Sequence, residues 1–479
     1  MHADPEPKIN LAAPCCSSLR IGGVLALALA VRLLIPLLGW LFVTPTPLVR
    51  EPDSESYLHA AEKLGRSDQQ HEPELVRTPG YPLLLKLGIW LKHVDLTTIL
   101  LQIGLGCLTT FLVYRLSQSV FERNDLATAA ALLYACEPVS ALYCSKLLGE
   151  TLFTAVLTLS LWLLCRWVRQ PGWGNLLWAA AAQAYAILVR PVAYVLPLVL
   201  ACTLVAVLWK RGPSRRELLS RAGAFLLLSM ASAWAWQARN YFTADYVQFS
   251  AISDINLYYY QAAAVLAQRR GVSLQAMQRE LGYFDDDVYF ARHPDQRSWT
   301  QAERYAYIGR EGRRIIAEHP ALMLRIQLQG AAALLLDPGV SAYLGFFRLD
   351  KAHTESGVAA DKTAEQRASA PRSMLMRITR ALREKPLVVA LYGALSLVWL
   401  IYAALAARGL LTKSAWQSPC GWLVLSAAAA LILLSGGPVG YHRFRLPVMP
   451  EICLLAGCGA VRLRETWVRI GARRNAVAR

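Results

Sequence analysis

Ten apolar runs of about 20 residues constrain this chain more than any other feature of its sequence. A segment that crosses a membrane must satisfy all of its backbone polar groups internally, so runs of this length predict transmembrane helices. We predict spans at 21–44, 96–115, 125–144, 147–165, 174–190, 192–209, 219–238, 386–407, 418–435 and 447–463. The expected fold is an all-α polytopic bundle of about ten transmembrane helices.

Composition supports a membrane bundle and excludes two other classes of protein. The chain is 55% hydrophobic and only 17% charged, which is too apolar for a soluble domain of 479 residues. Its net charge of +17 comes from Lys and Arg between and beyond the apolar runs. No basic face or RNA-binding motif is present, so we expect no nucleic-acid partner. Most cysteines lie within apolar runs, and Cys15 and Cys16 lack metal-ligand spacing, so a disulfide framework and a zinc site are not expected.

An eleventh apolar segment, 319–337, carries Arg325, Gln327 and Gln329 near its start, so we expect it to lie along the interface or to re-enter. The basic loop from Lys210 to Arg221 and the basic tail should both be cytoplasmic. Ten spans satisfy both assignments, whereas eleven would not. No small-residue cleavage site follows the first run, which we therefore interpret as an uncleaved helix.

This topology divides the chain into five parts. They are a cytoplasmic N-terminus (1–20), a transmembrane core of seven spans (21–238), an external region with the interfacial helix (239–385), C-terminal transmembrane helices (386–463) and a basic cytoplasmic tail (464–479). The external loop 45–95 of the core contains two stretches, Tyr57 to Leu64 and Tyr81 to Trp90, that predict amphipathic or short apolar juxtamembrane helices. We expect His353 to Pro371 to be a mobile loop.

Two carboxylates stand at the predicted external face. Asp53 follows the first span, and Glu150 begins the fourth. Each has a local explanation. Asp53 could cap a helix, and the carboxylate of Glu150 is favourable at a helix N-terminus because of the helix dipole. Because both should reach one membrane face, they could also hold an acceptor hydroxyl and remove its proton.

Arginines at external helix ends run against the positive-inside tendency. They are Arg77, Arg190, Arg239, Arg443 and Arg445. Such side chains could extend toward lipid phosphates, but several converging guanidinium groups would hold a phosphate or pyrophosphate head group. The segment Tyr441 to Pro447 brings aromatic and basic groups to one external corner, where His442 has no second His at ligand spacing. Arg32, near the middle of the first run, requires a partner within the bundle.

The order of these motifs resembles the GT-C polyprenyl-phosphate-dependent glycosyltransferases, in the bacterial branch similar to protein mannosyltransferases and the lipid A aminoarabinose transferase. The resemblance covers most of the chain. It rests on Pro52-Asp53-Ser54 with Tyr57, Arg77-Thr78-Pro79-Gly80-Tyr81-Pro82, Gly149-Glu150-Thr151-Leu152-Phe153, Arg190-Pro191, Arg239-Asn240-Tyr241 and Tyr441 through Pro447. The chain departs from well-known members by its Pro-Asp-Ser in place of an Asp-Glu pair and by Arg77 where some relatives have Lys.

The resemblance implies a membrane glycosyltransferase that moves a sugar, with inversion, from a polyprenyl phosphate such as undecaprenyl phosphate to a glycan, lipid or protein acceptor. It implies that Asp53 is the essential external acid, that Glu150 resembles a second acid, and that Arg77, Arg239, Tyr441 and Arg443 hold the carrier phosphate. We add Tyr57, Arg190 and Arg445 as candidate substrate-binding residues. The expected location is the inner membrane with a periplasmic active site. The sequence defines no cofactor and leaves a divalent metal open.

Two other functions remain open on the sequence alone. A polyprenyl-lipid flippase or transporter would also need Arg32 and a basic cavity, although we find no repeated halves of the kind that transporters usually show. Another GT-C reaction, such as glycan ligation from a pyrophosphate carrier, would share the fold and differ in the donor.

Overall fold

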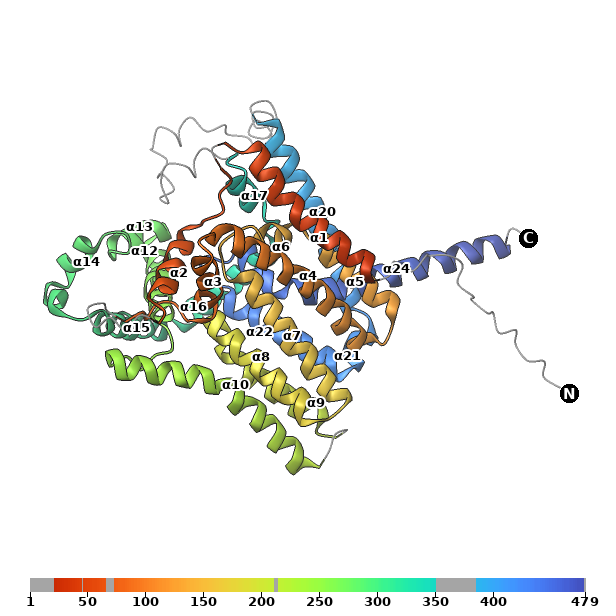
Figure 1. Ribbon diagram of the computed structural model, residues 1–479, viewed down its shortest axis with the longest axis horizontal. Coiled ribbons are helices and arrows are strands. Elements are labelled where there is room, and N and C mark those ends of the chain that lie inside the picture. The colour runs from red at the N-terminus through yellow and green to blue at the C-terminus, as the bar shows by residue number, and fades with distance from the viewer. Residues whose placement is uncertain (1–20, 45, 66–72, 211–213, 350–384, 478–479) are drawn as a thin grey trace.

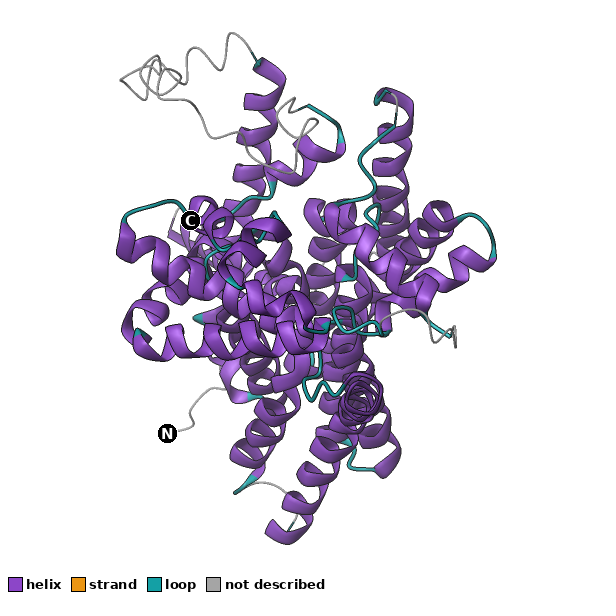
Figure 2. Ribbon diagram, turned by 90° about the vertical axis from the view of Figure 1, so that its left-hand side faces the viewer, coloured by secondary structure: helices purple, strands orange, loops and turns teal. Residues whose placement is uncertain are grey.

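The computed structural model describes residues 21–44, 46–65, 73–210, 214–349 and 385–477. These residues form helices joined by loops, without strands among them (Figures 1 and 2). The predicted all-α class is therefore confirmed. The predicted mobile loop at 353–371, together with Cys15 and Cys16, lies outside the described residues.

Seven helical segments in the described part are long and apolar enough to cross a membrane. They are α1 (Ile21–Phe42), α4 (Val94–Phe121), α7 (Glu150–Arg169), η1 with α9 (Pro191–Leu208), α10 (Arg215–Ala244), α20 (Pro386–Leu410) and His442–Ala472, most of which belongs to α24 (Met449–Val477). Each coincides with a predicted span. Leu41 and Phe42 of α1 and Leu397 and Leu400 of α20 are exposed, as expected for helices that face lipid.

Three shorter apolar helices accompany them: α8 (Trp173–Val189), α16 (Pro320–Leu336) and α22 (Pro419–Ser435). Two of these coincide with predicted spans, and α16 coincides with the predicted interfacial segment. The short helix α21 (Lys413–Gln417) precedes α22.

The prediction of one continuous helix over 125–144 is wrong. The chain breaks at Glu137 into α5 (Asn124–Cys136) and α6 (Pro138–Tyr143). Pro138 disfavours a helical conformation in the residue before it and lacks an N–H, and the carboxylate of Glu137 accepts from the backbone N–H groups of Val139 and Ser140. An apolar run can thus contain a helix end where side chains replace the missing backbone partners.

Arg32 supplies part of that replacement. Its side chain is fully buried, and it donates to the carbonyls of Tyr134 and Ala135 at 3.3 and 3.1 Å. These carbonyls belong to the last turn of α5, where intrahelical donors are lacking. Gly106 of α4 leaves room for the guanidinium, because a Cβ there would come within 2.4 Å of Nε of Arg32. Arg32 therefore caps a helix end within the bundle.

Both predicted juxtamembrane helices are present, as α2 (Pro52–Lys63) and α3 (Gly80–Trp90). The segment after α10 forms a separate group of helices, at the left of Figure 1, which we call the outer lobe. It contains α11 (Ala251–Ile255), the π-helix η2 (Asn256–Ala262), α12 (Ala263–Arg270), α13 (Leu274–Glu280), α14 (Asp286–Arg292), η3 (Pro294–Ser298) and α15 (Gln301–Glu318). The lobe has its own apolar core, which includes Tyr258, Val265 and Ile308. The helix α17 (Val340–Phe346) follows α16, and α23 (His442–Arg445) and η5 (Leu446–Val448) precede α24.

Candidate functional site

The start of α2 carries Asp53, whose side chain is 38% exposed. Glu51 is the N-cap residue of this helix, and its backbone N–H donates to Oγ of Ser54 at 2.9 Å. Ser54 also donates to the carbonyl of Leu147, which fixes the helix start against the loop before α7. The cap therefore does not use Asp53, whose carboxylate turns toward two arginines.

Those arginines are Arg77 and Arg443, which come from distant parts of the chain. Nη2 of Arg77 lies 2.7 Å from Oδ1 of Asp53, and Nη1 of Arg443 lies 2.7 Å from Oδ2. Burial by itself would raise the pKa of Asp53, but the positive charges of Arg443 and Arg77 outweigh burial and hold this pKa well below its usual range. Asp53 is therefore ionised at neutral pH, and both of its oxygens already accept from a guanidinium.

Glu150 joins the same group from the first turn of α7. Nη1 of Arg190 lies 2.9 Å from its Oε1, and Nε of Arg443 bonds the same oxygen. The side chain of Glu150 is only 2% exposed, and its Oε2 is buried without a hydrogen-bond partner among the described residues. Arg443 thus lies between two carboxylates, and one carboxylate oxygen remains available.

Two tyrosines border this cluster. The guanidinium of Arg77 lies 4.2 Å from the ring centre of Tyr57, and Nε of Arg77 donates to Ser56. Tyr441 precedes the α23 helix that carries Arg443, and burial raises the pKa of its hydroxyl although Arg443 opposes the rise. We call Asp53, Glu150, Arg77, Arg190 and Arg443 the ionic cluster. Tyr57 and Tyr441 form part of its wall.

A support beneath the cluster was not predicted from the sequence. Oδ2 of Asp337 accepts from the backbone N–H of His442 at 3.0 Å and lies 2.8 Å from Nδ1 of the same residue. Nε2 of His442 lies 3.4 Å from the hydroxyl of Tyr143. Arg443 directly follows His442, so Asp337 fixes the turn that aims Arg443. The Asp337-Pro338-Gly339 turn carries no local signal of this role.

An ion pair with a buried lysine links the two segments that carry the acids, and it was also missed. Lys146, which is 2% exposed, pairs with Glu51, and its ammonium lies 5.2 Å from the ring centre of Tyr143. Because Glu51 precedes α2 and Lys146 precedes α7, this pair ties together the two segments that carry Asp53 and Glu150.

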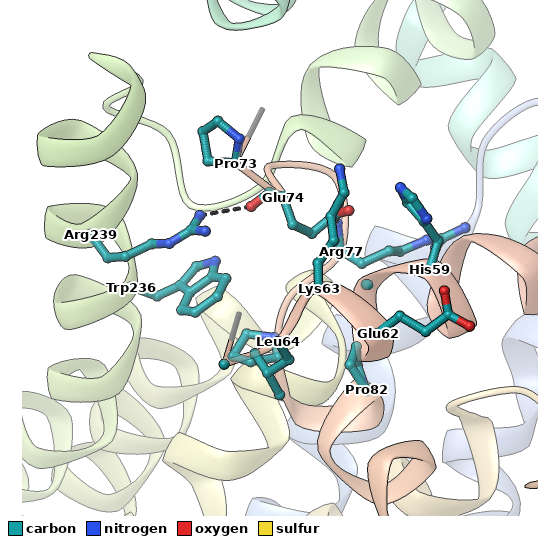
Figure 3. A pocket seen from close by; sticks show the side chains of 13 residues that line it. His59, Glu62, Lys63, Leu64, Pro73, Glu74, Arg77, Pro82, Trp236 and Arg239 are labelled. Atoms are coloured by element: carbon teal, nitrogen blue, oxygen red, sulfur yellow. Dashed lines mark hydrogen bonds between the residues drawn. The ribbon is translucent and has the colours of Figure 1, made fainter. Parts of the chain in front are cut away.

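Arg239 lies apart from the ionic cluster, at the edge of a neighbouring cavity of about 260 Å³ (Figure 3). Its Nη1 donates to the carbonyl of Glu74 at 2.8 Å, and its guanidinium lies over the ring of Trp236. The cavity is also lined by Arg77, which contacts Asp53 on its other side. Arg77 therefore connects the cavity with the cluster.

The structure does not bring Arg445 to the cluster. Its side chain is buried, donates to the carbonyls of Leu334 and Asp337, and lies 3.6 Å from the ring centre of Trp399. Residues two apart on a helix face different directions, so the α23 turn that aims Arg443 at the cluster aims Arg445 at the end of α16.

The chemistry of the cluster favours a phosphate ligand. Its three guanidinium groups and two carboxylates leave one positive charge in a largely buried setting. Each arginine uses only some of its five N–H donors in these contacts, so phosphate oxygens could be bound in addition to the carboxylates. No group of three potential metal ligands occurs among the described residues.

Comparison with known families gives one match in sequence. Residues 76–236 match the family model described as dolichyl-phosphate-mannose-protein mannosyltransferase, which confirms the resemblance drawn from the motifs. That segment contains Arg77, Glu150 and Arg190. No curated protein matches this chain.

Comparison with solved structures identifies the GT-C fold. The archaeal oligosaccharyltransferase AglB from Archaeoglobus fulgidus, in complex with an inhibitory peptide and a dolichol-phosphate, matches with a TM-score of 0.50 and 12% identity over 95% of this chain and 52% of that one. The same enzyme tethered to an acceptor peptide gives a TM-score of 0.52 at 13% identity, over 96% and 51%. ArnT from Cupriavidus metallidurans bound to undecaprenyl phosphate gives a TM-score of 0.38 at 15% identity, over 92% and 78%. The chain spans about half the length of the oligosaccharyltransferase.

Proposed function

We propose that this multi-pass membrane protein of the GT-C fold is a glycosyltransferase, which moves a sugar from a polyprenyl-phosphate carrier to an acceptor on the extracytoplasmic face. One observation carries the proposal: Arg443 lies between Asp53 and Glu150, with Arg77 and Arg190 on either side. The family match over residues 76–236 supports the same reaction class.

The arginines would act on the leaving group. In the displacement, the acceptor oxygen attacks the anomeric carbon while the bond from that carbon to the phosphate oxygen breaks, and the proton of the acceptor hydroxyl passes to the departing phosphate or to solvent. Negative charge grows on the departing phosphate, and guanidinium groups already held in place stabilise it more in the transition state than in the ground state. We assign the carrier phosphate to Arg77 and Arg443, with Arg239 and the adjoining cavity on its approach.

Asp53 would act on the acceptor. A carboxylate with a strongly lowered pKa is a weak base, so we propose that Asp53 orients the acceptor hydroxyl through a hydrogen bond. Glu150 would fix the positions of the Arg190 and Arg443 side chains relative to each other, because both contact the same oxygen of its buried carboxylate. Tyr57 packs against Arg77 and would keep that guanidinium in place.

Transfer by the purified protein in proteoliposomes tests this function. Synthetic polyprenyl-phosphate sugars would be supplied with lipid, glycan and peptide acceptors, and the products would be identified by mass spectrometry. We expect a product with the wild type and, because an oriented catalytic group contributes about 100-fold or more, a correspondingly lower rate with Asp53→Asn. Unchanged turnover in that variant would overturn the assignment of Asp53. Movement of the carrier lipid across the membrane without any sugar transfer would contradict the proposed enzymatic function and favour a flippase.

A further inference from the structure

The outer lobe is attached to the loop that carries Arg77. The backbone N–H of Ala251 donates to the carbonyl of Leu75 at 2.8 Å, and Oγ of Ser250 donates to the carbonyl of Val76 at 2.6 Å. These bonds join the start of α11 to the residues just before Arg77. The first end of the lobe is therefore fixed beside the ionic cluster.

The next helices of the lobe reach the segment that carries Arg443. A groove of about 350 Å³ is lined by Ala264 and Ala267 of α12 on one side and by Gly437 and Gly440 on the other. Gly440 directly precedes Tyr441 and α23. The chain from α11 to α12 thus runs from the loop of Arg77 to the loop of Arg443, and η2 is its middle.

The middle of this crossing is a π-helix with three consecutive tyrosines. A π-helix is rare and often occurs at functional sites, and η2 extends over seven residues, Asn256–Ala262. Tyr258 packs into the core of the lobe. Tyr260 takes another direction: its hydroxyl lies 2.7 Å from that of Tyr283, and the two ring centres are 5.4 Å apart.

The carboxylate of Asp53, in the ionic cluster, also acts electrostatically on the hydroxyl of Tyr260. Burial raises its pKa most, the hydrogen bond with Tyr283 raises it further, and the negative charge of Asp53 adds to the effect. Tyr260, which carries one hydroxyl of the pair, lies on η2 between the attachment to the loop of Arg77 and the groove beside the loop of Arg443. Phe284, which is 44% exposed, contacts the ring of Tyr283 at the rim.

This pair has the chemistry of a carbohydrate subsite. Aromatic faces pack against the C–H groups of a sugar ring, and phenol hydroxyls both donate to and accept from sugar hydroxyls. Neither hydroxyl pairs with a cation among the contacts of the described residues, so the pair is less suited to a phosphate than the arginines are. We propose that Tyr260 and Tyr283 bind the sugar of the donor while the ionic cluster binds its phosphate, an assignment that rests on the proposed function.

The variants Tyr260→Phe and Tyr283→Phe test the subsite, since each removes a hydroxyl and keeps the ring. Tyr307→Phe is the matched control, because Tyr307 packs against Trp299 and His293 elsewhere in the lobe. The assays are transfer with two donors that differ in the orientation of one sugar hydroxyl, and binding of polyprenyl phosphate that carries no sugar.

We expect each subsite variant to lower kcat/KM for the donor by about three- to tenfold, the equivalent of one lost hydrogen bond, and to change the ratio between the two donors. Binding of the bare carrier and the control variant should be unaffected. An equal loss for the bare carrier, or a change confined to the KM of the acceptor, would overturn the subsite.

If the wild type transfers no sugar, the proposed function fails. In that case carrier binding still tests the subsite. If the wild type binds the sugar-bearing carrier more tightly than the bare carrier and Tyr260→Phe loses this difference, the subsite is supported. Equal binding of the two carriers by the wild type would refute it.

Discussion

Nη1 of Arg443 lies 2.7 Å from Oδ2 of Asp53, although one residue follows the first membrane helix and the other precedes the last. The same guanidinium bonds the buried carboxylate of Glu150. The side chain of Arg443 therefore pairs with both acids, which the sequence analysis placed only on the same external membrane face. The proposed chemistry depends on this bridge.

Replacement of Arg443 tests the bridge directly. Arg443→Lys keeps the charge but cannot reach both carboxylates with a planar fork, so we expect transfer to fall about 100-fold, the scale of losing one preorganised transition-state donor. The measurement is steady-state transfer together with carrier-phosphate binding. Arg216→Lys, at an exposed position in the first turn of α10, is the matched control and should retain activity. Wild-type activity in Arg443→Lys would mean that charge alone suffices.

The pH dependence tests the role of Asp53. Its pKa is lowered in the folded protein, so its contribution to stability is present above the unfolded value of about 3.9 and is lost as the pH falls through the folded value. Asp53 stays ionised throughout the neutral range. We therefore expect no titration of Asp53 in kcat/KM between about pH 5 and pH 8. A fall in kcat/KM on the acid side with a midpoint of about pH 6, and a shift of that midpoint in Asp53→Glu, would instead identify Asp53 as a general base.

The Asp337–His442 contact should act through Arg443. Asp337→Ala removes two interactions that fix His442, and we expect transfer to fall about tenfold, equivalent to about 1.4 kcal/mol. The contacts of Arg445 use main-chain carbonyls, so this variant should still fold.

A double-mutant cycle separates positioning from general loss of stability. If Asp337 acts through His442, the loss of kcat in Asp337→Ala combined with His442→Gln should be smaller than the sum of the two single losses, because both single variants remove the contact between Asp337 and the imidazole. Additive losses, or equal losses in carrier binding and thermal stability, would contradict this pathway.

Arg32 should affect stability more than catalysis. Arg32→Leu leaves the carbonyls of Tyr134 and Ala135 without this donor inside the bundle, and we expect a cost of about 2 kcal/mol, within the range for buried unsatisfied groups. Thermal unfolding in detergent is the measurement. Leu29→Ala, at an exposed position on the same helix, is the control. A catalytic loss in Arg32→Leu at unchanged stability would point to a role beyond helix capping.

Several features were predictable because they depend on local chain chemistry. Apolar length alone located seven spanning helices, since a membrane segment must be helical and long enough to cross. The two helices between the first spans followed from short apolar and amphipathic patterns. The prediction missed the break at Glu137 because it gave apolar length more weight than the local signal of Pro138, and the capping of the exposed carbonyls by Arg32, from another helix, is not visible in the sequence.

The sequence by itself determined the class of protein, most of its helices and the acids and arginines that could form a site. Only the tertiary structure decided which of these residues meet. It joined Asp53, Glu150 and Arg443, left Arg239 beside a neighbouring cavity, and turned Arg445 toward the end of α16. The physical reason is that hydrophobic patterning fixes where helices form, whereas the pairing of charged side chains depends on packing between helices that are distant in the chain.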